Sequence, residues 1–196
     1  MSRNQLTPDK YMTPQEAGAL DARLAALDTS DPLVARDHAY LSFLRLTGVR
    51  ASEALNLERR DFLGVFDGAG GERFGRVHIR TLKQGLDRVV PVPGWLYDRC
   101  LSMAGAFPGS PIFASDTGEA IKLRRADQIW RTYRTCDKKL HSLRHTFGRE
   151  LYRATRDILL VKYALGHASV SNTQIYTEMD MEDDLSRALG ALRGAS

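Results

Sequence analysis

The order of helix-like and strand-like segments restricts this chain to few possible folds. Residues 60–66, 75–80 and 88–92 have the pattern of short strands, and turns that contain glycine separate them. Segments with apolar residues at helical spacing lie on both sides of this region. Because parallel strands need long crossover connections, strands joined by short turns pair in antiparallel fashion. The sequence therefore predicts one α+β domain, mainly helical, with a small three-stranded antiparallel sheet.

Local capping signals predict where the first helices begin. Thr13-Pro14-Gln15-Glu16 has the form of a capping box, and apolar residues at helical spacing follow it as far as Leu27. Asp31-Pro32 is expected to begin a second helix, and Gly48 suits the C-terminal end of that helix. The other expected helices span residues 52–57, 95–103, 124–135, 142–154, 158–164, 172–176 and 184–192.

Composition excludes several classes of protein. The chain has 196 residues, of which 43% are hydrophobic and 27% charged, which fits one globular domain with its own core. It contains no apolar stretch near the roughly 20 residues that span a bilayer, and its first residues lack the apolar core of a signal peptide. Cys100 and Cys136 do not have the spacing of a disulfide framework or a zinc site, so we expect two free thiols.

Basic residues cluster in one part of the chain. Residues 121–157 hold eleven Lys and Arg against four Asp and Glu, although the net charge of the whole chain is only +4. Such a block favours binding to a polyanion, because Lys and Arg release counterions that are condensed on DNA. A solvated helix face would show the same pattern. The candidate contacts to a DNA backbone are Lys122, Arg124, Arg125, Arg131 and Arg134.

Two motifs in the first half of the chain carry candidate phosphate chemistry. Arg50 follows Gly48, and Glu53 comes three residues later, within reach on one helical face. The two residues could form an ordinary surface ion pair, or Glu53 could hold Arg50 for bidentate contact with a phosphate. Lys83 lies in the turn between the second and third expected strands. Its ammonium group could protonate a leaving oxygen.

A histidine cluster lies in the second half of the chain. His141 and His145 have the spacing of a helical metal pair, but the zinc hydrolase motif requires Glu after the first His, and Ser142 stands there. We therefore expect no metal ion. His141 and Arg144 fit better as phosphate ligands, which leaves His145 with a packing or hydrogen-bonding role.

A further histidine and a tyrosine complete the set. His167 follows a glycine at an expected helix end, and Tyr176 comes nine residues later. A phenol, imidazoles and guanidinium groups together are the groups needed to attack a phosphodiester and to stabilise its charge.

In order and completeness, these motifs resemble the catalytic domain of the tyrosine recombinase (phage integrase) family. The resemblance extends from about Leu6 to about Tyr176. The matching stretches are residues 47–53, 82–85, 88–91, 141–147, 165–167 and 173–176.

The resemblance implies that four residues act on the scissile phosphate. Arg50 and Arg144 would clamp it, and His167 would donate a hydrogen bond to it. His141 would assist at the same phosphate and move the proton of the nucleophile.

The resemblance also implies roles for the three remaining candidates. Tyr176 would attack the phosphate and form a 3′-phosphotyrosyl bond. Lys83 would protonate the 5′ oxygen as it leaves, and Glu53 would support the site.

The function implied by the resemblance is site-specific DNA recombination, by integration, excision or inversion. The phosphotyrosyl bond would conserve the energy of the broken bond, so neither ATP, a metal nor another cofactor is expected. The expected partners are double-stranded DNA, further copies of the chain in a tetramer on DNA, and accessory DNA-bending proteins. Two alternatives are a DNA-binding accessory or regulatory protein on the same fold, and an activity like that of a type IB topoisomerase. The expected location is the cytoplasm and nucleoid of a bacterium or phage-infected cell.

The resemblance divides the chain into three parts. Residues 1–12 form an N-terminal tail, residues 13–178 the catalytic domain, and residues 179–196 a C-terminal tail whose leucines could dock on a neighbouring protomer. Most such recombinases carry an additional helical DNA-binding domain before the catalytic domain. The length here is similar to that of the short fimbrial phase-variation invertases, and Met1 favours a naturally minimal enzyme over an excised domain.

Overall fold

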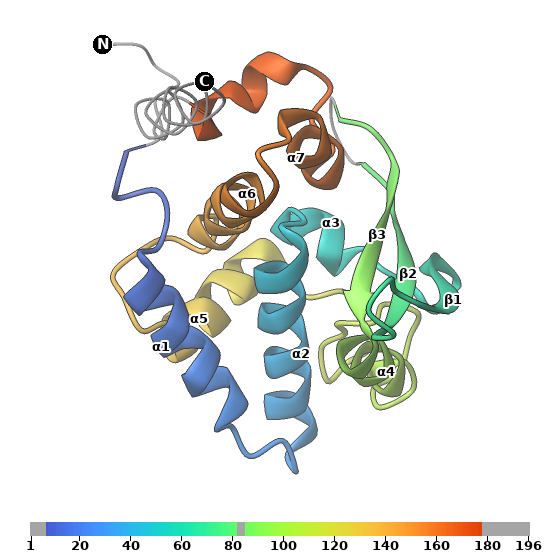
Figure 1. The fold of residues 1–196 in the computed structure, drawn as a ribbon. Helices are drawn as coiled ribbons and strands as arrows, with labels where there is room; N and C mark the ends of the chain where they lie inside the picture. Colours follow the sequence, from blue (N-terminus) through green and yellow to red (C-terminus); the bar gives the residue numbers. More distant parts are fainter. Residues whose placement is uncertain (1–6, 82–84, 178–196) are drawn as a thin grey trace, which may run out of the picture.

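The three strands lie on one side of the molecule, and helices make up the rest (Figure 1). The computed structural model describes residues 7–81 and 85–177. The predictions for Lys83, for the helix at 184–192 and for the C-terminal tail lie outside these residues. Within them, the predicted fold class is confirmed: helices predominate, with one antiparallel sheet of three strands in the order β1-β2-β3.

The first helices begin and end where local signals predict. Helix α1 (Pro14–Ala25) begins at a complete capping box, in which the hydroxyl of Thr13 accepts from the Glu16 N–H at 3.2 Å and the Glu16 carboxylate accepts from the Thr13 N–H at 2.8 Å. Helix α2 (Pro32–Thr47) begins at Asp31, whose carboxylate accepts from the Leu33 N–H. It ends at Gly48, which has a left-handed φ of 62°. The short helix α3 (Ala51–Leu55) follows directly.

The sheet consists of β1 (Phe62–Asp67), β2 (Arg73–Ile79) and β3 (Arg88–Pro93). Its buried side chains include Val77 and Val90, which are register partners on adjacent strands. The prediction that the first strand begins at Arg60 was wrong, because residues 59–61 form a 3₁₀ turn, η1 (Arg59–Asp61). The Asp61 carboxylate accepts the Glu58 N–H at 2.9 Å and so closes this turn before the strand begins.

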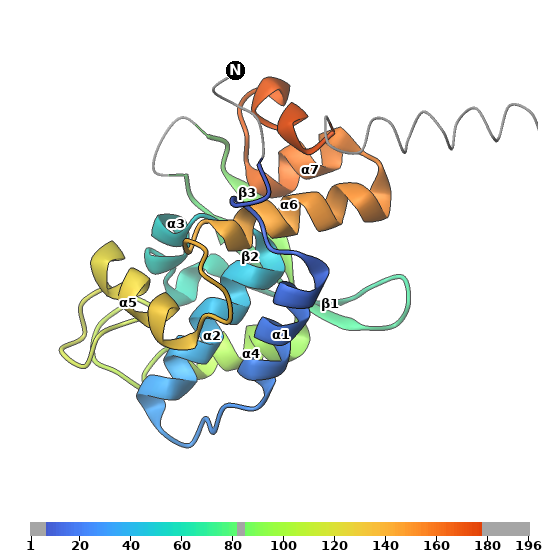
Figure 2. The ribbon, with the colours of Figure 1, turned by 90° about the vertical axis from the view of Figure 1, so that its left-hand side faces the viewer.

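Four further α-helices follow the sheet within the described residues. These are α4 (Gly94–Met103), α5 (Leu123–Tyr133), α6 (Ser142–Thr155) and α7 (Ile158–Leu165). Helix α4 packs on all three strands, whereas α2 contacts both α4 and α6 and so links the sheet side to the helical side. Most of α2 is buried for this reason. In Figure 2, α3, α5 and the beginning of α6 lie along one side of the molecule.

The segment before the end of the described chain departs from its prediction. Residues 172–176 do not form one short helix, but belong to two 3₁₀ turns, η2 (Val170–Asn172) and η3 (Gln174–Tyr176). Thr173, which is fully buried between them, bonds its N–H to the carbonyl of Val170 at 2.7 Å, and the Tyr176 N–H bonds to the carbonyl of Thr173 at 3.0 Å. These i→i−3 bonds keep both turns short.

Two hydrophobic clusters form the interior of the part of the chain that the structure describes. The larger one includes the inner face of the sheet and residues from α1, α2, α4 and α5. The smaller one contains Tyr11, Tyr152, Val161, Leu165 and Tyr176. Tyr11 and Met12, which fall in the expected N-terminal tail, are buried. The Met12 N–H donates to Thr146 of α6 at 2.8 Å, so this segment is held against the helix.

The end of α2 is expected to tolerate no side chain at Gly48. A Cβ there would lie 2.3 Å from Cδ1 of Phe147, and the left-handed φ alone costs about 1–2 kcal/mol for an alanine. We expect Gly48→Ala to lower the free energy of unfolding by about 2–4 kcal/mol, measured by urea denaturation. Gly18→Ala, at a helical position of α1 with open space around it, is the control and should stabilise by up to about 1 kcal/mol. Equal behaviour of the two variants would contradict this account.

Candidate active site

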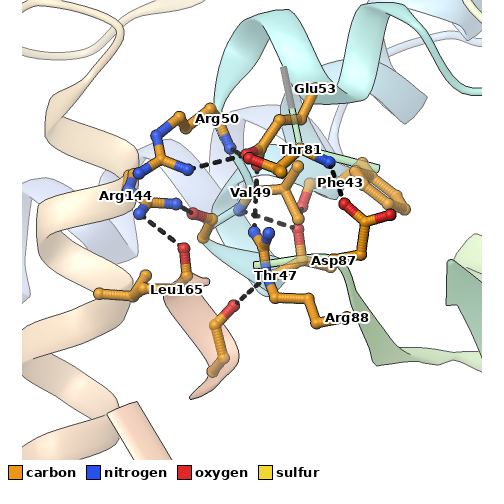
Figure 3. Close-up of polar contacts among 12 residues, drawn as sticks. Phe43, Thr47, Val49, Arg50, Glu53, Thr81, Asp87, Arg88, Arg144 and Leu165 are labelled. Carbon is orange, nitrogen blue, oxygen red and sulfur yellow. Dashed lines mark hydrogen bonds and ion pairs between the residues drawn. The ribbon is translucent and has the colours of Figure 1, made fainter. Parts of the chain in front are cut away.

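A buried carboxylate connects two arginines at the centre of the site (Figure 3). Glu53, on α3, pairs through Oε1 with Nη1 of Arg50 at 2.8 Å and through Oε2 with Nη2 of Arg88 at 3.1 Å. Its Oε2 also accepts the backbone N–H of Arg50 at 3.1 Å. Burial by itself would raise the pKa of Glu53, but the charges and hydrogen bonds of Arg88 and Arg50 outweigh it and lower that pKa. Glu53 therefore stays ionised and fixes the Arg50 side chain, which is 30% exposed.

Arg88 is a site residue that the reasoning from sequence missed. Its side chain is 1% exposed, and its Nε donates to the carbonyl of Ala164 at 2.8 Å while Nη2 contacts Glu53. A Cβ at Gly166 would lie 2.4 Å from Nη1 of Arg88, so the glycine makes room for the guanidinium. The signal was present in the alternation of β3, since Arg88 shares a face with the buried Val90 and Val92.

Arg144 is held by the ends of two helices. It lies in the first turn of α6, with Nη1 bonded to the carbonyl of Gly48 at 2.8 Å and Nη2 to the carbonyl of Leu165 at 2.7 Å. These carbonyls stand at the C-terminal ends of α2 and α7, where helix dipoles favour a cation. Burial and the neighbouring Arg50 lower the pKa of Arg144 to about 9, which leaves it protonated at pH 7.

His167 follows the left-handed Gly166 that ends α7. Its Nδ1 lies 3.0 Å from the hydroxyl of Thr173, a second residue that the sequence analysis did not single out. Burial, with Arg144 and Arg50 nearby, lowers the pKa of His167 to about 3, so its imidazole is neutral at pH 7.

The loop between β2 and β3 reaches the same place. Gly85 forms an antiparallel bridge with His167, and the Leu86 N–H donates to the carbonyl of Gly166 at 3.3 Å. At the base of the loop, the carboxylate of Asp87 accepts the Thr81 N–H at 2.7 Å (Figure 3). The described residues on either side of the segment that contains Lys83 are thus held beside the arginines.

Tyr176 and two histidines form the remaining side of the site. His141 is exposed just before α6, and its ring meets that of His145 edge-on, with the centroids 4.7 Å apart. The Tyr176 hydroxyl lies 3.1 Å from Nδ1 of His145. Its ring packs over Gly148 of α6, where a Cβ would lie 2.8 Å from Cζ, and Tyr176 is 1% exposed. Burial raises the pKa of Tyr176 to about 12, against the opposing effect of Arg144 and Arg50.

The basic candidates on α5 and at its two caps take part in none of the contacts described above. Lys122, Arg124, Arg125 and Arg131 are exposed, which agrees with either a solvated face or a nucleic-acid contact. Arg134 is half-buried and pairs with Asp137 at 2.7 Å. Among residues 7–81 and 85–177, no group of three His, Cys, Asp or Glu side chains could hold a metal ion. No helix in these same residues is both long and apolar enough to cross a membrane.

Comparison with known proteins assigns the family. The model of the phage integrase family matches residues 10–183. The chain belongs to the phage integrase family. Tyrosine recombinase XerD of Chlorobaculum tepidum is 32% identical over 187 residues, which cover 88% of this chain and 58% of that protein. Tyrosine recombinase XerC of Nitrobacter winogradskyi is 32% identical, with 83% of this chain and 52% of that protein covered.

Solved structures share the fold. XerH site-specific recombinase, bound to its difH substrate in a pre-cleavage complex, gives a TM-score of 0.69 at 24% identity, covering 88% of this chain and 50% of that one. XerA recombinase gives a TM-score of 0.66 at 24% identity, covering 93% of this chain and 66% of that one. This chain of the phage integrase family spans little more than half the length of the curated relatives that it matches.

We expect Arg88 to be essential for the stability of the site. Arg88→Met keeps most of the side-chain volume but leaves the carbonyl of Ala164 without a donor and Glu53 with one cation instead of two. The free energy of unfolding should fall by about 3 kcal/mol, measured by urea denaturation. The control is Arg73→Met, which removes a solvent-exposed ion pair with Asp98 and should change it by no more than about 1 kcal/mol. Similar losses in both variants would refute a special role for Arg88.

The buried histidines are expected to make the fold sensitive to acid. His145 and His167 have pKa values lowered mainly by burial, to about 4 and about 3, whereas in the unfolded chain both titrate near 6.5. As the pH falls from about 6.5 to about 4, the unfolded chain binds protons that the folded chain does not, so stability decreases. The slope of unfolding free energy against pH gives the number of protons that the chain takes up on unfolding. We expect His145→Asn to lower this number by about one between these pH values. An unchanged slope would show that His145 is not buried in its neutral form.

Proposed function

We propose that this chain is the catalytic domain of a site-specific DNA recombinase, which cuts and rejoins DNA through a covalent bond to Tyr176. One observation carries the proposal: a tyrosine hydroxyl, two fixed guanidinium groups and a neutral imidazole converge from separate elements of one fold. Family membership supports it, and some solved relatives of the same fold are recombinases bound to DNA. We assign residues 13–178 to this domain.

The arginines are suited to binding the scissile phosphate. Phosphoryl transfer spreads negative charge over the non-bridging oxygens, and fixed cations stabilise that charge without reorganising. Arg50 is partly exposed and held by Glu53, so the guanidinium nitrogens that do not contact Glu53 are placed to reach a phosphate. Arg144 is held in place by hydrogen bonds to the carbonyls of Gly48 and Leu165. We assign these two residues to the phosphate, with His167 as a further hydrogen-bond donor and His141 as an assisting group at the exposed edge.

Tyr176 is the proposed nucleophile. Attack by its hydroxyl oxygen on phosphorus forms a 3′-phosphotyrosyl bond and releases a 5′ hydroxyl, which can later reverse the step. Lys83 is the proposed acid for the 5′ oxygen, since the loop that carries it begins and ends beside Arg50 and His167. Neither ATP nor a metal ion takes part in this scheme.

The remaining contacts concern assembly on DNA. We propose that Lys122, Arg124, Arg125 and Arg131 contact the DNA backbone from α5, with a smaller contribution from the ion-paired Arg134. In Figure 2, α5 lies along the same side of the molecule as α3 and the beginning of α6, which supports a continuous DNA-binding face. Recombination exchanges strands between two duplexes, and we propose a homotetramer on DNA, with residues 179–196 in contact with a neighbouring protomer and DNA-bending proteins as accessory factors.

Covalent trapping tests the proposed reaction. We expect wild-type protein, incubated in EDTA with nicked duplexes tiled across the DNA that flanks its gene, to form an adduct that survives SDS. The nick lets the short fragment that carries the released 5′ hydroxyl diffuse away, so the covalent intermediate accumulates. Tyr176→Phe should abolish the adduct and leave DNA binding unchanged, because only the nucleophilic oxygen is lost. DNA binding without an adduct from the wild type would point instead to an accessory or regulatory protein.

A further inference from the structure

Two imidazoles stand at the beginning of α6, and they differ in what they touch. His141 is exposed and contacts the ring of His145 edge-on. His145 is half-buried, and its Nδ1 lies 3.1 Å from the hydroxyl of Tyr176. Among the described residues, the contact to the nucleophilic oxygen therefore comes from His145. The resemblance to the family implied instead that His141 moves the proton of the nucleophile.

We propose that His145 is a further catalytic residue, whose Nδ1 accepts the hydroxyl proton of Tyr176 while the phenolic oxygen attacks phosphorus. This inference rests on the proposed function. The hydrogen-bond distance is within the range required of a general base in direct contact with its proton. In the tautomer that carries its proton on Nε2, the imidazole leaves the lone pair of Nδ1 free for the phenol.

The packing of Tyr176 makes the contact specific. The phenol ring lies over Gly148, one turn along α6 from His145, and has no room for a Cβ beneath it. Tyr176 is 1% exposed and Val161 and Leu165 belong to the same apolar cluster. Bulk water therefore has little access to the hydroxyl, which favours proton transfer to a side chain in contact with it. The ring of His145 is the group at the required distance.

The proposed step conserves protons and electrons. The O–H bond of Tyr176 breaks and its proton passes to Nδ1 of His145, while a bond forms between the phenolic oxygen and phosphorus. The bond from phosphorus to the 5′ oxygen breaks, and that oxygen leaves with the electron pair and takes a proton from a separate donor, Lys83 in the proposed scheme. When a 5′ hydroxyl attacks the phosphotyrosyl bond, the imidazolium returns its proton to the phenolic oxygen.

The cations around His145 disfavour its imidazolium form in the free protein, and a bound DNA phosphate would offset them. Arg144 faces it from α6 and His141 from the residue just before that helix. Lys10 lies nearby in the N-terminal segment, and Tyr176 faces it from η3. Together with burial, which is the largest effect, the cations lower the pKa of His145 to about 4, so the imidazole is neutral at pH 7. A DNA phosphate adds a negative charge beside these cations, which favours the imidazolium that the step creates.

Single-turnover cleavage kinetics separate a base from a mere hydrogen-bond partner. The substrate is the nicked duplex that gives the adduct with wild-type protein. We expect His145→Ala and His145→Asn to slow adduct formation by about 100-fold or more, because neither side chain can take the proton. The asparagine can still place an oxygen where Nδ1 of His145 stood and accept a hydrogen bond from the phenol. Both variants should bind the duplex as tightly as wild type. Free imidazole in the buffer should restore much of the rate of His145→Ala and none of the rate of Tyr176→Phe.

The matched control is His38→Ala. His38 is a partly buried histidine on α2 whose ring packs near Trp95, away from the site, and its pKa is also lowered by burial. This variant should cleave at the wild-type rate. Circular dichroism and thermal melting of all variants identify any loss of folded structure.

Two results would overturn the inference while leaving the proposed function intact. One is a cleavage rate for His145→Asn within about threefold of the wild-type rate. The loss of a general base slows a reaction far more than this, so such a result would show that a hydrogen bond to the phenol is enough. The other is a slow His145→Ala variant, folded and bound to DNA, that imidazole does not rescue. Absence of an adduct from wild-type protein is a different outcome, because it would overturn the proposed function and the inference with it.

Discussion

The site depends on one buried carboxylate placed among guanidinium groups. Without Glu53, Arg50 and Arg88 would repel each other at close range, and Arg88 would be a buried cation without an ionic partner. A buried charge is tolerated when it is paired and hydrogen-bonded, and Glu53 meets this condition for both arginines. Through Arg88 the same carboxylate is linked to the end of α7, so one acidic side chain ties together α3, β3 and α7.

The ends of helices supply the remaining negative partners. The carbonyls of Ala164 and Leu165, adjacent residues in the last turn of α7, accept hydrogen bonds from Arg88 and Arg144, and the carbonyl of Gly48 accepts from Arg144 as well. Such terminal carbonyls have no partner within their own helix. The fold therefore satisfies its helix ends and positions its cations with the same bonds, and it leaves Arg50 as the arginine with exposed surface beside them.

The helix caps could be predicted from the sequence, whereas short 3₁₀ turns and the tertiary contacts of the site could not. Asp31 and Gly48 bound α2 as expected, because a cap and a left-handed turn are local chemistry. The fold class followed from periodicity in the same way. Arg60 was assigned to a strand, since the turn that precludes it depends on a carboxylate that closes back on the chain. The motifs gave no role to Arg88, because its partner Glu53 lies 35 residues away in sequence. They gave none to Thr173, because its contact with His167 depends on the turn between them. The family motifs supplied the identity of the candidates, and geometry supplied their contacts.

Tyr176 lies near the end of the described chain, after every residue that holds the cations of the site. The arginines, their carboxylate and the helix ends that hold them all precede it in sequence, and the phenol joins them from the last turn, η3. Under the proposed function, a chain cut short before residue 176 would contain the phosphate-binding arginines but not the attacking hydroxyl, so it could bind DNA only without cutting it.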